Sequence, residues 1–278
     1  MEARHRQAAP PRFPFPAYPR GWFALARTAQ IPDDGAVVVH RLGRDWRVAR
    51  AGDGYTVTAQ GRQDPRPCRQ RGPFVLVWHC ANGAEPDYDV PEFPEVAAPG
   101  WQPYQVGRWR IRSHPQELME NGADTAHFRV VHFMEAPRTD VAVDGPLLSF
   151  RTAATREVLA ADDAVSFHTL CYGLGFSSNR YWGQLDAMMF IGITPIDGRE
   201  VEVTLAFTFL DDEGTDARRR FGRDYGRYVF EDFERDIPLW EHKRFRAEPV
   251  LCDGDGPIGV VREWAAQFYT DDAARRPS

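Results

Sequence analysis

The stretch from residue 120 to residue 132, ENGADTAHFRVVH, holds three side chains that can serve a metal: Asp124, His127 and His132. Asp124 and His127 are three positions apart, so they lie on the same face of a helix. His127 and His132 are five apart, so they converge only if the helix bulges or ends between them. A histidine on an apolar face is more often a hydrogen-bonded core residue than a ligand. The pattern alone therefore leaves a metal site and a polar core cluster both open.

The surrounding sequence predicts a helix that carries this group. Ser113 can cap its start, Pro115 suits its first turn, and Gln116 follows three residues after the cap. Apolar residues then recur near the helical period of 3.6 residues, as expected for a helix with one buried face: Leu118, Met119, Ala123, Ala126, Val130 and Val131.

A carboxylate far along the chain can complete a metal site. The segment from Thr215 to Phe245 is predicted as one long helix, and Asp236 falls within its apolar stripe of Phe221, Tyr225, Val229, Phe233 and Trp240. A buried carboxylate is unfavourable unless it is paired or coordinated. Two interpretations follow for Asp236, a salt bridge to Arg223 or Arg235 and a metal ligand.

These motifs resemble those of a known family. Glu120 followed by Asn121-x-x-Asp124-x-x-His127-x-x-x-x-His132 resembles the catalytic signature of Rieske-type non-haem iron oxygenases, in the branch of ketosteroid hydroxylases and cholesterol 7-desaturases. The resemblance implies that His127 and His132 bind a mononuclear Fe(2+). It also implies that Asp124 links this iron to a Rieske cluster on a neighbouring subunit. Asn121 and Asp124 are the candidate catalytic residues.

The third ligand is also implied by this resemblance. The segment DIPLWEHK, residues 236–243, resembles the part of the family that supplies the carboxylate, which makes Asp236 the candidate. Two histidines and one carboxylate form a facial triad that leaves coordination positions open for oxygen. The expected cofactor is therefore a single ferrous ion.

The sequence departs from the family where the Rieske cluster should be. A Rieske [2Fe–2S] cluster needs two cysteines and two histidines, which the family supplies as Cys-x-His and Cys-x-x-His. Neither pair occurs in this sequence, and the resemblance is interrupted between Thr58 and Pro73. We interpret this as loss of the cluster-binding loops, and we expect no [2Fe–2S] cluster in this chain.

The expected fold is α+β. We predict a flexible N-terminal arm (1–20), a degenerate Rieske-like β domain without cluster ligands (21–105), and a catalytic domain (106–278) of the helix-grip, START-like kind with an antiparallel sheet. Several side chains in the last domain could line an apolar substrate pocket, although core packing explains them equally: Tyr172, Phe176, Tyr181, Met188 and Trp240.

Composition excludes several classes of protein. The net charge of −6 gives no reason to expect a nucleic-acid partner, and no apolar run is long enough to span a membrane. The N-terminus does not read as a signal peptide, and the four scattered cysteines are typical of reduced thiols. We therefore expect a cytoplasmic protein.

Three functions follow from these observations. The chain is expected to be an oxygenase subunit that hydroxylates, desaturates or demethylates an apolar, steroid-like or polycyclic substrate with O2. Its electrons would come through a Rieske-containing homologous subunit, served by a ferredoxin or reductase, in a trimer or a mixed trimer or hexamer. The alternatives are a self-standing mononuclear iron enzyme and a non-catalytic partner of a complete oxygenase.

Overall fold

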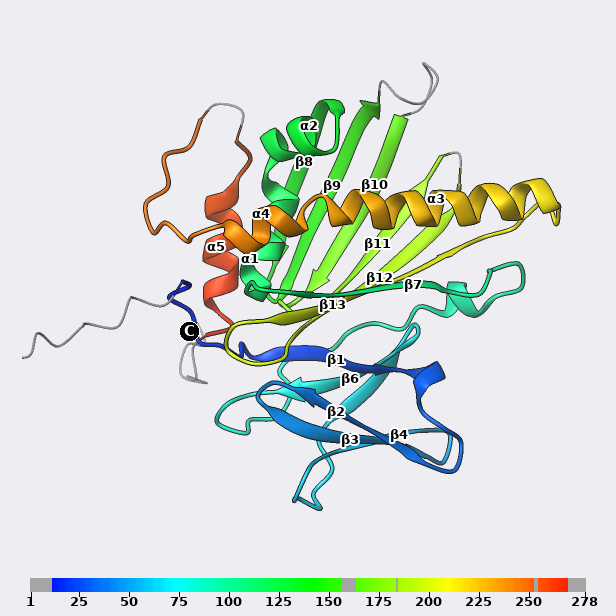
Figure 1. Ribbon diagram of the computed structural model, residues 1–278, viewed down its shortest axis with the longest axis vertical. Helices are drawn as coiled ribbons and strands as arrows, with labels where there is room; N and C mark the ends of the chain where they lie inside the picture. Colours follow the sequence, from blue (N-terminus) through cyan, green and yellow to red (C-terminus); the bar gives the residue numbers. More distant parts are fainter. Residues whose placement is uncertain (1–11, 157–163, 184, 253–254, 270–278) are drawn as a thin grey trace, which may run out of the picture.

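A computed structural model describes residues 12–156, 164–183, 185–252 and 255–269. The N-terminal part forms two antiparallel sheets of three strands, which lie below the large sheet in Figure 1. Both sheets contribute to one apolar core. In sheet order, the first contains β1 (Gly21–Arg27), β6 (Phe74–His79) and β5 (Cys68–Arg71), and the second contains β2 (Ala36–Arg41), β3 (Arg44–Ala51) and β4 (Gly54–Ala59).

The rest of the chain is built on one antiparallel sheet of seven strands. Strands β8 to β13 follow one another as a meander, and β7 pairs with β13 at one edge. In sheet order the strands are β7 (Gln105–Ile111), β13 (Val201–Phe209), β12 (Ala187–Pro195), β11 (Phe176–Trp182), β10 (Ala164–Tyr172), β9 (Leu147–Arg156) and β8 (Met134–Asp144).

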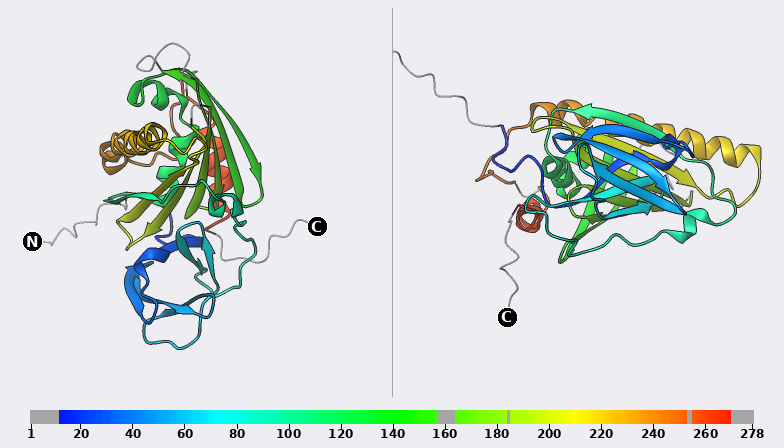
Figure 2. Two further views of the ribbon diagram at one scale, coloured as in Figure 1. Left: turned by 90° about the vertical axis from the view of Figure 1, so that its right-hand side faces the viewer. Right: turned by 90° about the horizontal axis from the view of Figure 1, so that it is seen from below.

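Helices cover one face of this sheet. Figure 2 shows α3 lying along the concave side of the curved sheet. The helical segments are α1 (Pro115–Glu120), α2 (Thr125–Val131), α3 (Asp216–Glu234), α4 (Ile237–His242) and α5 (Ile258–Ala266), with 3-10 turns η1 (Thr28–Gln30), η2 (Pro94–Ala97) and η3 (Asn121–Ala123). The predicted α+β fold, an antiparallel sheet that grips a long helix, is confirmed.

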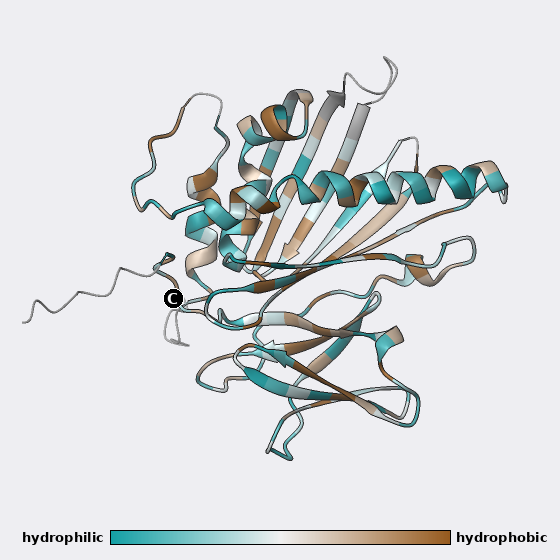
Figure 3. Cartoon of the chain, in the orientation of Figure 1, coloured by the Kyte–Doolittle hydropathy of each residue, from teal (hydrophilic) through white to brown (hydrophobic). Residues whose placement is uncertain are grey.

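The central strands are buried on both faces. In β12, Met189 and Ile191 belong to the core under the helices, whereas Met188 and Phe190 pack against Trp22 of the N-terminal part. Successive residues of a strand point to opposite faces, so a strand covered on both sides is apolar along its whole length. Figure 3 shows this contrast between the apolar strands and the mainly hydrophilic α3.

Two predicted helices are each divided in the structure. The helix expected from residue 113 becomes α1, η3 and α2, and His114, not Ser113, is the N-cap of α1. The helix expected from Thr215 to Phe245 becomes α3 and α4, with Asp236 between them. His127 and His132 were expected to converge only if their helix bulges or ends between them, and α2 ends there. The prediction of one long helix from Thr215 to Phe245 was wrong, because contacts between distant segments, described below, fix the break at Asp236.

Residues 12–20 of the predicted flexible arm are anchored. The ring of Phe15 stacks on that of Tyr269 with centroids 5.4 Å apart, and Arg12 donates a 2.8 Å hydrogen bond to the carbonyl of Lys243. Residues 1–11 of that arm lie outside the described residues. The domain limits 1–20, 21–105 and 106–278 stay a prediction, although strand pairing groups 21–79 apart from 105–209.

No helix in the described ranges is both long and apolar enough to cross a membrane.

The neutral ring of His114 links the N-terminal arm to α1 through two hydrogen bonds. Its Nδ1 accepts a hydrogen bond from the Gln116 amide at 3.3 Å, and its Nε2 lies 3.1 Å from the carbonyl oxygen of Pro16. Only the neutral ring with its proton on Nε2 can make both bonds. Burial lowers the pKa of His114 to about 4, although the bond to Pro16 raises it.

We expect this histidine to make stability depend on pH. Between pH 6.5 and 4 the unfolded chain binds a proton that the folded chain excludes, so stability falls as the pH falls through this window, by roughly 3 kcal/mol in total. Urea unfolding at a series of pH values measures the slope. His114→Gln should remove most of it, whereas His40→Gln, at an exposed histidine, should not. An unchanged slope in His114→Gln would refute this origin.

Candidate metal centre

His127 and His132 converge because α2 ends between them. Asp124 caps the helix, since its Oδ1 accepts a 3.0 Å hydrogen bond from the His127 amide. The helix stops at Val131, and His132 is its C-cap. Phe133 then takes a positive φ of 53° and turns the chain into β8. This geometry brings the Nε2 atoms of the two histidines to 2.9 Å from each other.

Asp236 meets both histidines at the break between α3 and α4. Its Oδ1 lies 2.9 Å from Nε2 of His127 and 3.2 Å from Nε2 of His132. Arg235 pairs with Asp232 instead, and no ion pair joins Asp236 to Arg235 or to Arg223 within the described ranges. The salt-bridge interpretation of Asp236 was therefore wrong, because the buried carboxylate is met by imidazoles.

The three atoms are spaced as a facial ligand set requires. Their separations are 2.9, 2.9 and 3.2 Å. Ligands at about 2.1 Å from a metal and at right angles to each other stand about 3.0 Å apart. His127, His132 and Asp236 are each under a tenth exposed. Among the described residues, this is the one group of three His, Cys, Asp or Glu side chains with potential ligand atoms close enough together to hold a metal ion.

The charges at this site are strongly coupled. Burial alone would raise the pKa of Asp236, but hydrogen bonds from His127 and His132 outweigh it and hold that pKa below its usual value. Burial would likewise lower the pKa of His132, yet hydrogen bonds to Asp232 and Asp236 raise it to about 9. A divalent cation would take the place of the proton that His132 holds at neutral pH.

Two further side chains orient the three candidate ligands. The Asn121 amide donates a 3.0 Å hydrogen bond to Oδ2 of Asp236, and its nitrogen also lies 3.0 Å from Nε2 of His127. Nδ1 of His132 lies 3.1 Å from Oδ2 of Asp232. A carboxylate behind a ligating histidine fixes the ring and its tautomer. Asp232 was not among the predicted site residues, although it stands four residues before Asp236, a spacing that puts two side chains on one face of the predicted helix.

We expect Asp232→Asn to weaken metal binding about 10- to 100-fold, because it removes the charge that orients His132. Competition against a chromophoric chelator with Co²⁺ measures the affinity. Asp224→Asn is the matched control, since Asp224 is an exposed residue of the same helix. Equal affinities for the two variants would contradict the assignment of Asp232.

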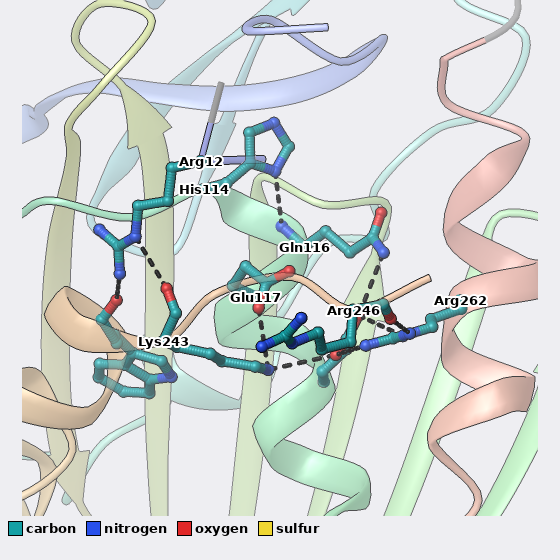
Figure 4. A network of polar contacts seen from close by, with 9 residues as sticks. Arg12, His114, Gln116, Glu117, Lys243, Arg246 and Arg262 are labelled. Atoms are coloured by element: carbon teal, nitrogen blue, oxygen red, sulfur yellow. Dashed lines mark hydrogen bonds and ion pairs between the residues drawn. The ribbon is translucent and has the colours of Figure 1, made fainter. Parts of the chain in front are cut away.

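A buried ionic network holds the ligand-bearing segments together (Figure 4). The ammonium of Lys243, the sole lysine of the chain, lies 3.0 Å from Glu117 and 3.2 Å from Glu120 of α1. Arg262 of α5 donates two hydrogen bonds to Glu120, at 3.0 and 3.1 Å. Lys243 follows α4, which begins directly after Asp236, and Asn121 directly follows Glu120. The contacts of Lys243 with α1 therefore hold in place the two segments that bring the Asn121 and Asp236 side chains together.

The arm reinforces this network from the other side. The guanidinium of Arg12 donates hydrogen bonds to the carbonyls of Trp240 and Lys243 at the end of α4, and to that of Arg112 after β7. The last carbonyls of a helix have no partner within it, so this arginine acts as a C-terminal cap.

We expect Lys243→Met to destabilise the protein by about 3 kcal/mol, the low end for removing one partner of a buried ion pair, because the Lys243 side chain is 35% exposed. Adding Glu117→Gln to Lys243→Met should restore part of the loss, since one uncompensated buried charge disappears. Urea unfolding of the four proteins in this cycle measures both effects. Additive losses in the double variant would contradict the network.

An apolar cavity of about 200 Å³ opens beside the three ligands, between the sheet and α3. His132 and Asp236 line it, with Asn121 and Asp232. Most of its remaining wall is apolar or aromatic: Leu118, Met119, Phe128, Met134, Phe150, Phe167, Met189, Ile191, Ile193, Val229 and Phe233. The arrangement joins a metal-ligand set to a site that suits an apolar molecule.

The predicted pocket residues divide between the two faces of the sheet. Tyr181 and Trp240 line the cavity. Tyr172, Phe176 and Met188 lie in the core between the sheet and the N-terminal part. Their expected place in the pocket was wrong, because alternation along β10, β11 and β12 points them away from the metal ligands.

Asp124 remains a candidate without a tested role. The structure places it as the N-cap of α2, partly exposed, next to the ligand His127. Its predicted part in electron transfer stays a prediction.

Part of the segment that interrupts the family resemblance lies beside the residues that follow β6. Residues 62, 64–66 and 79–83 line a polar cavity of about 350 Å³ in the N-terminal part. His79 and Cys80 are the histidine and cysteine of this wall. The absence of a cluster stays a prediction from the missing Cys-x-His and Cys-x-x-His pairs.

Solved structures share this fold. Dicamba monooxygenase bound to dicamba is 14% identical with a TM-score of 0.63, covering 94% of this chain and 100% of that chain. Pseudomonas putida CBB5 NdmA with caffeine is 14% identical with a TM-score of 0.64, covering 89% of each chain. The chain therefore has the fold of these oxygenases, and at its site two histidines and one aspartate are placed so that they could hold a metal ion.

The family can be stated more narrowly. Residues 77–269 match the model of the 3-ketosteroid 9alpha-hydroxylase C-terminal domain, and the chain belongs to that family. The resemblance drawn from the 120–132 and 236–243 motifs is thereby confirmed.

Curated relatives are consistent with this membership. Cholesterol 7-desaturase of Caenorhabditis elegans is 24% identical over 245 residues, which is 79% of this chain and 57% of the relative. The oxygenase component of 3-ketosteroid-9-alpha-monooxygenase is 25% identical in Rhodococcus rhodochrous (76% of this chain, 61% of the relative) and in Mycobacterium tuberculosis (84% and 66%). The chain thus spans less than two thirds of the length of these relatives.

Proposed function

We propose that this chain is the iron-bearing subunit of an O2-dependent oxygenase that acts on an apolar substrate. The observation that carries the proposal is a buried facial set of two imidazoles and one carboxylate opening onto an apolar cavity. A ferrous ion in such a set has positions left for dioxygen and, with two electrons from outside, supports hydroxylation or desaturation of an unactivated carbon.

The chain's own residues supply the environment for this chemistry. His127, His132 and Asp236 would hold the metal, and Asn121 and Asp232 orient them. The apolar wall removes water from the substrate's surface and excludes charged molecules. Steroid-like substrates are favoured by the names of the relatives, a cholesterol desaturase and 3-ketosteroid monooxygenases.

We further propose that the two electrons come from a Rieske cluster on another polypeptide. The sequence keeps Asp124 beside the ligand His127 but lacks the cluster's own ligand pairs. In a ring of head-to-tail subunits, each iron site faces the neighbouring subunit. A related subunit with a cluster, in a mixed trimer or hexamer and served by a ferredoxin or reductase, would therefore reduce this site through Asp124.

We expect product only from a mixture of this chain with a Rieske-containing homologue and reductase, and none from the chain alone. Asp124→Asn in the mixture should lower turnover at least tenfold. Iron content should stay unchanged, because asparagine caps a helix as well as aspartate does. Product formation and iron content are measured on the same samples. His127→Ala is the metal-free control, and it should abolish both iron and product.

The other outcomes separate the alternatives. Full activity of the chain alone would make it a self-standing iron enzyme. Unchanged activity of the mixture with His127→Ala would make it a non-catalytic partner of a complete oxygenase. Either result would overturn the proposed electron route.

A further inference from the structure

A row of polar side chains on β11 lines the sheet side of the cavity. In β11, Ser177, Asn179 and Tyr181 alternate towards the helix-covered face, and all three line the cavity. Asn179 is in register with Thr169 of β10 and Met189 of β12, which line it as well. This amide therefore lies on the sheet side of the cavity, whereas the metal ligands come from the helical side.

The Asn179 amide is only half satisfied. Its nitrogen donates a long hydrogen bond of 3.5 Å to the hydroxyl of Tyr181. Its Oδ1 is buried and has no hydrogen-bond partner among the residues that the structure describes, and the side chain is 7% exposed. Leaving such a buried acceptor unpaired costs about 1–3 kcal/mol. An apolar residue of similar size would avoid this cost, so the asparagine is explained by a group that enters the cavity.

We propose that Asn179 recognises a hydroxyl group on an otherwise apolar substrate. In the orientation in which the amide nitrogen donates to Tyr181, Oδ1 of Asn179 can only accept a hydrogen bond, so the group that matches it is a donor. In the surrounding wall, Met189, Ile191, Phe167 and Phe150 suit a hydrocarbon skeleton. The other uncharged polar side chains on the sheet side of the wall are hydroxyl-bearing: Thr152, Thr169, Ser177 and Tyr181. The substrate class is thus an apolar, cyclic alcohol, which deepens the proposed function without requiring iron for binding.

This contact would also select the carbon that reacts. The hydroxyl is held at the sheet, while His132 and Asp236 lie in the cavity wall formed by the helices. A rigid skeleton anchored at one end presents a fixed carbon to the opposite wall. Sites built to bond a hydroxyl reject analogues without it more strongly than apolar sites reject an extra methylene. Asn179 is in this respect a specificity-determining residue.

The test uses three probes with one skeleton, 2-decalol, 2-decalone and decalin, on metal-free protein. A bicyclic skeleton is chosen because the cavity of about 200 Å³ is smaller than most sites for drug-sized ligands. Quenching of intrinsic fluorescence measures binding. The wild type should bind the alcohol at least tenfold more tightly than the ketone or the hydrocarbon. Asn179→Leu should lose this preference, bind decalin more tightly, and unfold at higher urea concentration than the wild type.

Ser177→Ala is the matched control, because it removes a different polar group, a hydroxyl, from the same strand and cavity wall but leaves Asn179 in place. It should keep the preference for the alcohol. The inference is overturned if the ketone binds more tightly than the alcohol, if no probe binds the wild type, or if Asn179→Leu keeps the wild-type order. Because binding is measured without metal, a failure of the iron proposal leaves this binding result unchanged. Likewise, a failure of the Asn179 inference leaves the iron proposal unchanged.

Discussion

The structure depends on how the negative charge of one buried carboxylate, that of Asp236, is balanced by its neighbours. Asp236 is 4% exposed and stands where the helical pattern calls for an apolar residue. Two imidazoles and the Asn121 amide surround it, and they can do so only because α2 ends at Val131 and α3 gives way to α4. The helix breaks are therefore part of the site: a continuous helix in either place would separate the ligands. A divalent cation would complete the group, since it satisfies all three ligand atoms at once.

The second requirement is that α1 and α4 stay in place although both are short. Six-residue helices have little stability of their own. Lys243 and Arg262 tie Glu117 and Glu120 of α1 to the segment after α4 and to α5, and Arg12 caps α4 from the arm. Such networks are weak sources of net stability, but they specify one arrangement among many. Here that arrangement sets the distance between Asn121 and Asp236.

Much of the site could be predicted from the sequence, because its main residues stand out by their local sequence patterns. His127, His132 and Asp236 are chemically distinct residues, two at short spacing and one interrupting an apolar stripe. The spacing of His127 and His132 indicated that their helix must bulge or end between them. The breaks at η3 and at Asp236 could not be predicted, because the residues around Asp124 and Asp236 favour a helix on local grounds and only distant contacts interrupt it. Lys243 and Glu120 are 123 positions apart, so no local pattern links them. Tyr172, Phe176 and Met188 were misplaced because both faces of their strands are buried, which removes the polar alternation that assigns a face.

X-ray absorption at the iron edge of the Fe(2+)-loaded chain tests the central claim most directly. The account predicts one shell of nitrogen and oxygen neighbours at about 2.1 Å, with the multiple scattering of two imidazole rings. Asp232→Asn provides the reference spectrum for a loosened histidine ligand, and His127→Ala, which should hold no iron, is the blank. Sulfur neighbours or an iron–iron distance would reveal a cluster bound to this chain. Those features, or a spectrum without imidazole scattering, would contradict the assignment of His127, His132 and Asp236 as the ligands of a single iron.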